Sequence, residues 1–423
     1  MHVCFVALKA LPVLVGGDVA GRISGADVQQ AVIARGLLER GWRVTFVVFD
    51  DGPDTPHEVD GIRLERAYAR DAGWPRVRFI HPRWTGLHAA IGRARPDVVY
   101  QRAAGCETGI VGCYRRLHPR CRFVFACGSD SDVAADLHYL RTARDRGLYR
   151  FGLRAADAIV TQSTQQTEQL RANFKRDGVL IPSAVARPDS SVDRGARPAT
   201  PPRLLWVGRV SYEKRPEWFV ELAAERAGWR FALVGDANHA TDHARSVLAR
   251  ARQLPNLTLH GAVAHAEMAT HYDAADLLVC TSHWEGFPNT FLEAWSRGAP
   301  VASTVDPDGV IQRHGLGVVA DSPAELEERC DHLLRDAARY RAMSLRCQAY
   351  VAEHHRVERA AQQYELLFEQ LLAGRKPRRG RAGFRAPRAA ARAELSAGST
   401  ARSPSGAATP HGAERGMCEI RRD

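Results

Sequence analysis

The chain of 423 residues lacks the features that mark membrane-spanning, secreted or zinc-binding proteins. No apolar run reaches the roughly 18–20 residues that a membrane-spanning helix needs. The nine cysteines are scattered without CxxC spacing, so neither a zinc site nor a disulfide framework is predicted. The segment Met1–Lys9 has no basic residue ahead of its apolar run. It predicts a buried first strand and a cytoplasmic protein, not a signal peptide.

Basic charge is plentiful, but it is unevenly placed. The net charge is +11, and residues 375–423 hold 12 basic and 4 acidic residues, whereas residues 1–374 have a surplus of only +3. The same tail is rich in Ala, Gly, Pro and Ser, so residues 373–423 are predicted to be a disordered basic tail. Such a tail is more often a solvated appendage than a reader of base sequence. No nucleic-acid partner is therefore predicted.

Before the tail, short β-branched runs alternate with amphipathic segments. Their nearly continuous apolar character is typical of parallel strands covered on both faces. The alternation stops in a Pro-rich stretch between Pro182 and Pro202 and starts again at Leu204. The sequence therefore predicts an α/β protein with two Rossmann-like domains facing across a cleft. Their expected bounds are 1–185 and 204–350, with a linker over 186–203 and one long C-terminal helix over 351–372.

A glycine-rich stretch, Gly16–Gly25, follows the first predicted strand. Glycine lets the backbone approach a ligand, and the next helix would present its N-terminus to an anion. The stretch does not match GxGxxG, so a purely structural turn explains it about as well. A nicotinamide dehydrogenase stays open as an alternative, because Asp50 and Asp51 follow the second predicted strand.

A second motif follows the strand predicted at Leu204–Val207, in Gly208–Pro216. It contains Arg209 and Lys214, and Lys214 is one of four lysines in a chain with 55 arginines. Basic side chains in a loop after a strand are well placed to bind a diphosphate. An exposed basic loop that starts a helix is an equally good explanation of this motif alone.

The third motif is the segment Trp284–Val301, in which Glu285 and Glu293 are separated by seven residues. Amides between Gly286 and Thr290 and the start of the next helix would offer hydrogen bonds to an anion. Glu293 also has a structural explanation, since Thr290-x-x-Glu293 has the spacing of a capping box.

Together these residues resemble the retaining glycosyltransferases of family 4, which have the GT-B fold. The resemblance rests on Gly208-Arg209 with Glu213-Lys214, and on the E-x7-E segment EGFPNTFLEAWSRGAPV. It covers roughly residues 1–372, with further matches at Ile181-Pro182, Leu233–Asp236 and Leu259–Gly261. It implies that the C-terminal domain holds a nucleotide-sugar donor and that the N-terminal domain holds the acceptor.

The resemblance also implies roles for individual residues. Arg209 and Lys214 would neutralise the diphosphate, Glu285 would face the anomeric carbon, and Glu293 would bind the ribose. The remaining donor-binding residues would be Gly25, Gly208, Gly286, Phe287, Asn289 and Thr290. No metal and no cofactor are expected. Members of the family often have a His after the fourth strand of the first domain, where this chain has Cys127–Asp132; the nearest His is His138, and Ser129 or Asp130 would have to substitute.

The favoured hypothesis is a metal-independent hexosyltransferase in surface polysaccharide or glycoconjugate assembly, with a glycan or lipid-linked acceptor. A sugar-nucleotide epimerase or hydrolase of the same fold, and a non-catalytic nucleotide-sugar-binding protein, are the alternatives. Basic stretches with aromatic residues, Arg76–Trp84 and Arg141–Arg154, suggest peripheral contact with the anionic inner face of the cell membrane. A solvated basic face explains them equally well.

Overall fold

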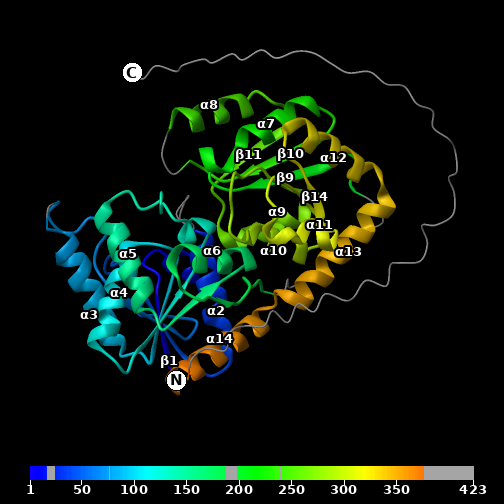
Figure 1. The fold of residues 1–423 in the computed structure, drawn as a ribbon. Helices are drawn as coiled ribbons and strands as arrows, with labels where there is room; N and C mark the ends of the chain where they lie inside the picture. Colours follow the sequence, from blue (N-terminus) through cyan, green and yellow to red (C-terminus); the bar gives the residue numbers. More distant parts are fainter. Residues whose placement is uncertain (17–23, 76, 187–197, 238–240, 376–423) are drawn as a thin grey trace, which may run out of the picture. The chain divides into compact units, whose positions relative to one another are not determined.

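A computed structural model describes residues 1–16, 24–75, 77–186, 198–237 and 241–375 (Figure 1). The N-terminal half forms an eight-stranded sheet of order β3-β4-β2-β1-β5-β6-β7-β8. Only the β3–β4 pair is antiparallel. The strands are β1 (His2–Val6), β2 (Arg43–Val48), β3 (Glu58–Val59), β4 (Ile62–Arg66), β5 (Val98–Arg102), β6 (Arg122–Ala126), β7 (Ala158–Thr161) and β8 (Val179–Leu180).

Helices cover both faces of this sheet, as expected when strands are apolar on both sides (Figure 1). All five residues of β1 and of β5 are buried. The helical segments are α1 (Leu11–Val15), α2 (Gly25–Glu39), η1 (Phe79–Trp84), α3 (Thr85–Ala94), α4 (Cys106–Leu117), η2 (Asp130–Val133), α5 (Ala143–Ala155) and α6 (Thr164–Phe174). Helix α1 was not predicted; it lies between the first strand and the glycine-rich stretch, of which residues 17–23 are outside the described residues.

The C-terminal half repeats this plan in a six-stranded parallel sheet of order β11-β10-β9-β12-β13-β14. Its strands are β9 (Arg203–Val207), β10 (Arg230–Val234), β11 (Leu257–Gly261), β12 (Leu277–Cys280), β13 (Val301–Ser303) and β14 (Gly317–Val319). The helical segments are η3 (Tyr212–Lys214), α7 (Pro216–Glu225), α8 (Asp242–Ala251), η4 (His265–Glu267), α9 (Met268–Ala274), α10 (Asn289–Ser296), η5 (Pro307–Gly309), α11 (Val310–His314), α12 (Pro323–Arg335), α13 (Ala337–His354) and α14 (Val357–Leu372). The prediction of two parallel α/β domains is therefore confirmed. Most of the linker and of the basic tail, residues 187–197 and 376–423, lie outside the described residues.

The single helix expected over 351–372 is wrong, because the chain bends at His355 and Arg356 between α13 and α14. The bend is held from the N-terminal domain: the amide of Val185 donates to the carbonyl of His355 at 2.9 Å. Beyond it, α14 returns to the first domain and packs on α2. The two helices meet at Gly36, where an added Cβ would lie 2.9 Å from the Cβ of Ala361.

Candidate active site

The carboxyl ends of both sheets open into one cleft of about 1100 Å³. All described residues belong to one compact unit, so both walls of this cleft can be described together. The C-terminal wall follows β9, β10 and β12 and includes the candidate site residues that were predicted from the two motifs. From the predicted set, Gly25, Gly208, Arg209, Lys214, Glu285, Gly286, Phe287, Asn289, Thr290 and Glu293 all line the cleft.

The charged centre of this wall is an ion pair between Lys214 and Glu285. The Lys214 ammonium contacts Oε1 of Glu285, and the Ser282 hydroxyl donates to the same oxygen at 2.6 Å. Burial lowers the pKa of Lys214, but the adjacent Glu285 carboxylate offsets this, and the net pKa is raised. Lys214 therefore stays charged at neutral pH.

Hydrogen bonds to backbone carbonyls connect the loop after β9 with the loop after β12. The Thr281 hydroxyl donates to the carbonyl of Lys214 at 2.7 Å, and the His283 amide donates to the carbonyl of Glu213 at 2.8 Å. The Arg215 guanidinium donates to the carbonyl of Thr281 at 2.7 Å. These three hydrogen bonds hold the loop that carries Lys214 close to the loop that carries Glu285 before any ligand binds. Arg209, from the same loop, is exposed and lies in the cleft wall.

Glu293 lies in the second turn of α10, and the alternative that it caps this helix is wrong. The helix begins at Asn289 after Pro288, and no side chain caps it, so Thr290 is already inside the first turn. The Glu293 carboxyl lies in the cleft beside the Tyr272 hydroxyl, His265 and Arg297. Burial raises the pKa of Glu293, and these three neighbours partly oppose that shift. Because α10 does not need the Glu293 carboxylate as a cap, this half-buried acid in the cleft can bind a ligand.

The segment Gly286–Thr290 lines the cleft, and the Phe287 side chain within it is buried. The Phe287 ring packs on His355 and Trp295, with ring centroids 5.0 and 6.3 Å apart. The first amides of α10 have no partner within the helix, so a ligand in the cleft can accept their hydrogen bonds. Gly286 is close to the N-terminal domain, since an added Cβ would lie 3.0 Å from Cα of Ser129.

Gly208 and Gly235 bring the ends of β9 and β10 unusually close. The Gly208 amide donates to the carbonyl of Val234 at 3.0 Å. An added Cβ on Gly235, where φ is +138°, would lie 1.7 Å from the carbonyl oxygen of Gly208. Only glycine fits there. Sequence reasoning quoted Gly235 within Leu233–Asp236 but did not place it in the site.

Gly25 is the first residue of α2 and joins the two walls. Its carbonyl accepts a 2.8 Å hydrogen bond from the Asn289 side chain. The helix starts with a capping box in which Ser24 and Asp27 bond reciprocally. Burial raises the pKa of Asp27, and the Ser24 bonds oppose the rise. Asp27 also lines the cleft and was not predicted, although its spacing from Ser24 marks a helix start.

Of the two residues expected to substitute for the missing first-domain histidine, Ser129 lines the cleft. Asp130 instead accepts a 2.9 Å hydrogen bond from the Gln166 amide group. Burial raises the pKa of Asp130 to about 6, with Asp308 and Glu285 adding to the rise. His138 does not replace the family's histidine, because it pairs with Asp136 and packs on Trp284.

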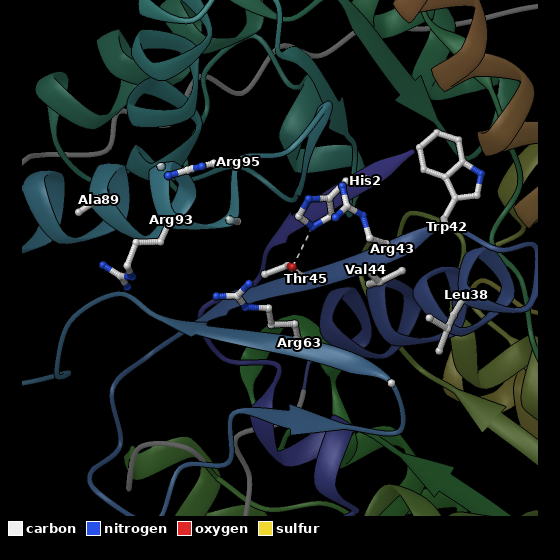
Figure 2. Close-up of a pocket in the computed structure, with 13 residues that line it drawn as sticks. His2, Leu38, Trp42, Arg43, Val44, Thr45, Arg63, Ala89, Arg93 and Arg95 are labelled. Carbon is white, nitrogen blue, oxygen red and sulfur yellow. Dashed lines mark hydrogen bonds between the residues drawn. The ribbon is translucent and has the colours of Figure 1, made fainter.

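A second hollow, of about 920 Å³, lies at the amino ends of β1, β2 and β4 (Figure 2). His2 and Thr45 are hydrogen-bonded there at 2.9 Å, and four arginines surround them. Arg63 and Arg93 both pair with the buried carboxylate of Glu65. The hollow thus offers charge but no acid or base free for chemistry, and the cleft is the better candidate.

Metal binding has no support among the residues that the structure describes: no group of three His, Cys, Asp or Glu side chains converges. No disulfide joins any of the eight cysteines in those residues. Within the same residues, no helix combines the length and the apolar character needed to cross a bilayer.

Comparison with known proteins agrees with this arrangement. Residues 24–184 match the family described as "Glycosyl transferase 4-like domain", and residues 201–336 match "Glycosyl transferases group 1". The chain is a family 4-type glycosyltransferase with the GT-B fold. The two matches fall on the two halves of the cleft. The family resemblance inferred from the motifs is thereby confirmed.

Curated relatives of this glycosyltransferase differ in what they act on. It is 28% identical over 320 residues to the 2-deoxystreptamine N-acetyl-D-glucosaminyltransferase of Streptomyces fradiae, covering 66% of this chain and 74% of the relative. It is also 28% identical over 227 residues to the D-inositol 3-phosphate glycosyltransferase of Kineococcus radiotolerans, covering 45% of this chain. That match spans about half, 52%, of the Kineococcus protein.

Solved structures agree on the fold. Sucrose-phosphate synthase from Thermosynechococcus elongatus superposes with a TM-score of 0.74 at 21% identity, over 88% of this chain and 100% of that one. Anabaena HepE in complex with UDP-glucose gives a TM-score of 0.68 at 16% identity over the same shares. At these identities the likeness concerns the fold alone.

Proposed function

We propose that this glycosyltransferase moves a hexose from a nucleotide-sugar donor to a glycan or lipid-linked acceptor, with retention of the anomeric configuration. The observation that carries the proposal is the Lys214–Glu285 pair, held by Ser282 in the wall of the cleft. A cation fixed beside a carboxylate suits a donor whose diphosphate leaves next to a developing positive charge on the sugar.

In this proposal the donor lies along the C-terminal wall. Arg209 and Lys214 bind the diphosphate, and the amides of Gly286–Thr290 add hydrogen bonds to its oxygens. Glu293 accepts from the ribose hydroxyls. Gly25 and Gly208 let backbone come close to the phosphates, while Phe287 acts through packing that holds its own backbone in place. Structures of HepE with UDP-glucose support a nucleotide-sugar donor for this fold.

Transfer then takes place on one face of the sugar. The bond between the anomeric carbon and the phosphate oxygen breaks, and the acceptor oxygen forms its bond from the same side. The acceptor proton passes to the departing phosphate oxygen. In this proposal Glu285 stabilises the positive charge that develops at the anomeric carbon, so the protein supplies positioning and charge rather than a general base.

The acceptor is proposed to bind on the N-terminal wall, within residues 1–185, while residues 204–350 hold the donor. Lys9, Arg70 and Glu107 line that wall beside Ser129. A role in assembly of a surface polysaccharide or glycoconjugate, at the cytoplasmic side of the cell membrane, fits a glycan or lipid-linked acceptor.

Two measurements test the proposal. Nucleotide sugars are first screened for thermal stabilisation of the protein, since a ligand at 100 times its Kd adds about 2.7 kcal/mol. The product formed with the stabilising donor is then analysed by NMR for anomeric configuration. Inversion would refute retention. Donor consumption that is unchanged without any acceptor would favour an epimerase or hydrolase.

A further inference from the structure

The strongest unexplained feature outside the cleft is an exposed apolar ridge formed by Trp74, Val77 and Ile80. Their exposed fractions are 81%, 54% and 65%. The amide of Val77 donates to the carbonyl of Trp74 at 3.0 Å, and the amide of Ile80 to the carbonyl of Val77 at 2.9 Å. The amides of Arg78 and His81 donate to the same two carbonyls at 2.7 and 3.0 Å, so the three side chains lie on successive turns. The ridge thus exposes three apolar side chains to water within seven residues.

The ridge is held in place by the residues that follow it. Phe79, within the same segment, is half-buried, and the Arg144 guanidinium lies 4.1 Å from its ring centroid. Phe79 also packs edge-on against Trp84, with ring centroids 6.0 Å apart. At Gly73 an added Cβ would lie 2.6 Å from Pro82, so the loop is tightly closed. Trp74, Val77 and Ile80 are exposed, whereas Phe79 in the same loop is half-buried.

The sequence around the ridge is basic: residues 70–84 contain four arginines and one aspartate, Asp71, and three of the arginines, Arg70, Arg78 and Arg83, are among the described residues. Arg70 pairs with Asp51, and Arg144 pairs with its neighbour Asp145. Arg78 and Arg83 form no ion pair within the part of the chain that the structure describes. The guanidinium groups of Arg78 and Arg83 are thus available to bind an anion next to the apolar side chains.

We propose that this ridge inserts into the interface of an anionic lipid bilayer. Trp with aliphatic side chains and arginine is the composition of interfacial anchors, in which the apolar parts enter the acyl boundary and the cations contact headgroups. Three side chains are too few for a stable protein interface, which buries about 800 Å² on each partner. A lipid surface needs only a small insertion with matching charge.

The ridge is close in sequence to the N-terminal wall of the cleft, so a contact with lipid would affect where acceptors are found. Arg70 lines the N-terminal wall of the cleft, and Trp74 follows it by four residues. Binding of the ridge to a bilayer brings the acceptor wall next to the lipid surface. This step rests on the proposed function, whereas the lipid contact itself does not.

The test compares full-length variants for cosedimentation with vesicles. Trp74→Ser combined with Ile80→Ser removes the ridge. Leu345→Ser is the control, because Leu345 is 58% exposed on α13 and is followed by Arg346. On vesicles containing phosphatidylglycerol, the ridge variant is expected to bind about tenfold or more weakly than wild type, and the control within about twofold. The difference should persist at high salt, which screens binding through the basic tail.

A second variant tests the lipid charge. Arg78→Gln with Arg83→Gln should weaken binding to phosphatidylglycerol vesicles at low salt by about fivefold for each arginine, and leave binding to pure phosphatidylcholine unchanged. Melting temperature and stabilisation by nucleotide sugar should match wild type in every variant. Equal vesicle binding by the ridge variant and wild type would overturn the proposal. So would a change in sedimentation coefficient on removing the ridge without any change in vesicle binding, which would indicate a protein contact.

Discussion

The two walls of the cleft are built differently. On the C-terminal wall, charged groups are already paired and cross-tied: Lys214 contacts Glu285, and Thr281 bonds to the backbone of Lys214. On the N-terminal wall, Lys9 is exposed, and Arg70 is half-buried and paired with Asp51, which is outside the cleft lining. The first wall thus holds a pair of opposite charges inside the cleft before ligand binding, whereas on the second wall Lys9 is exposed.

This difference matches what the two walls are proposed to bind. Nucleoside diphosphate sugars share their diphosphate, so one fixed arrangement of cations and amides suits all donors of this class. Acceptors vary, as the names of the inositol phosphate and deoxystreptamine relatives indicate. We therefore expect substitutions on the C-terminal wall to affect donor use and turnover strongly. Side-chain substitutions on the N-terminal wall should leave nucleotide binding intact, because Gly25, the phosphate contact proposed there, acts through its backbone.

The largest effect is expected for Lys214→Ala. Removing one charge that stabilises the transition state should lower kcat by about 10²–10³-fold. The measurement is steady-state transfer with the donor found by screening, together with melting temperature. Lys175→Asn is the control: it removes another lysine, exposed at the end of α6, and asparagine tolerates the left-handed backbone there. A loss of turnover in Lys214→Ala of less than about twofold would show that the ion pair is structural.

Low pH should reduce the stability of the protein through His355, which lies at the contact between the two domains. Burial lowers the pKa of His355 to about 4, although its bond to the carbonyl of Ser183 opposes the change. The unfolded chain binds the proton at about pH 6.5. Stability from neutral His355 is thus complete above about pH 6.5 and falls as the pH drops towards 4, by about 3 kcal/mol in total.

Urea unfolding at several pH values between about 7 and 4 measures this slope. His355→Gln should be less stable at neutral pH and should lose part of the pH dependence. His2 also has a lowered pKa through burial, so His2→Gln is the matched comparison in the N-terminal domain alone. An unchanged slope in His355→Gln would mean that other groups cause the acid sensitivity.

Glu293→Gln should raise the donor KM several-fold with little change in melting temperature. Glutamine keeps the shape but not the charge, and a hydrogen bond to a charged group is worth about 1.5–3 kcal/mol. Because α10 starts at Asn289 without any cap from Thr290, helix stability should not depend on this residue. An unaltered KM would place the ribose elsewhere on the wall.

Much of the C-terminal wall could be predicted from the sequence, because local signals dictate it. Gly208–Pro216 and Trp284–Val301 each follow a buried strand of a parallel sheet, and carboxyl ends of such strands converge. Sequence alone favoured a cap for Glu293, since the spacing from Thr290 fits a capping box. In the structure the N-cap of α10 is Pro288, so Thr290 lies inside the helix and cannot cap it.

Contacts between distant segments could not be predicted. The bend at His355 depends on Val185, which lies 170 positions earlier, and no local signal in 351–372 marks it. Asn289 reaches Gly25 only when both domains are folded. The glycine at 235 is required by the carbonyl of Gly208 on the neighbouring strand, so its role depends on sheet order rather than on its own segment.

The smallest effect on nucleotide binding is expected for a substitution on the N-terminal wall. This substitution tests the comparison between the two walls most directly. Lys9 lines the cleft opposite the donor residues and is exposed. If side chains of the C-terminal wall alone supply the charge that binds the nucleotide, Lys9→Ala should change the nucleotide Kd by less than about twofold, because an exposed charge is largely screened by solvent and salt. Calorimetric titration of Lys9→Ala, beside Arg209→Ala as the positive comparison, measures this. A tenfold loss in Lys9→Ala would mean that side chains of both walls bind the phosphates, and the assignment of donor binding to the C-terminal wall would have to be abandoned.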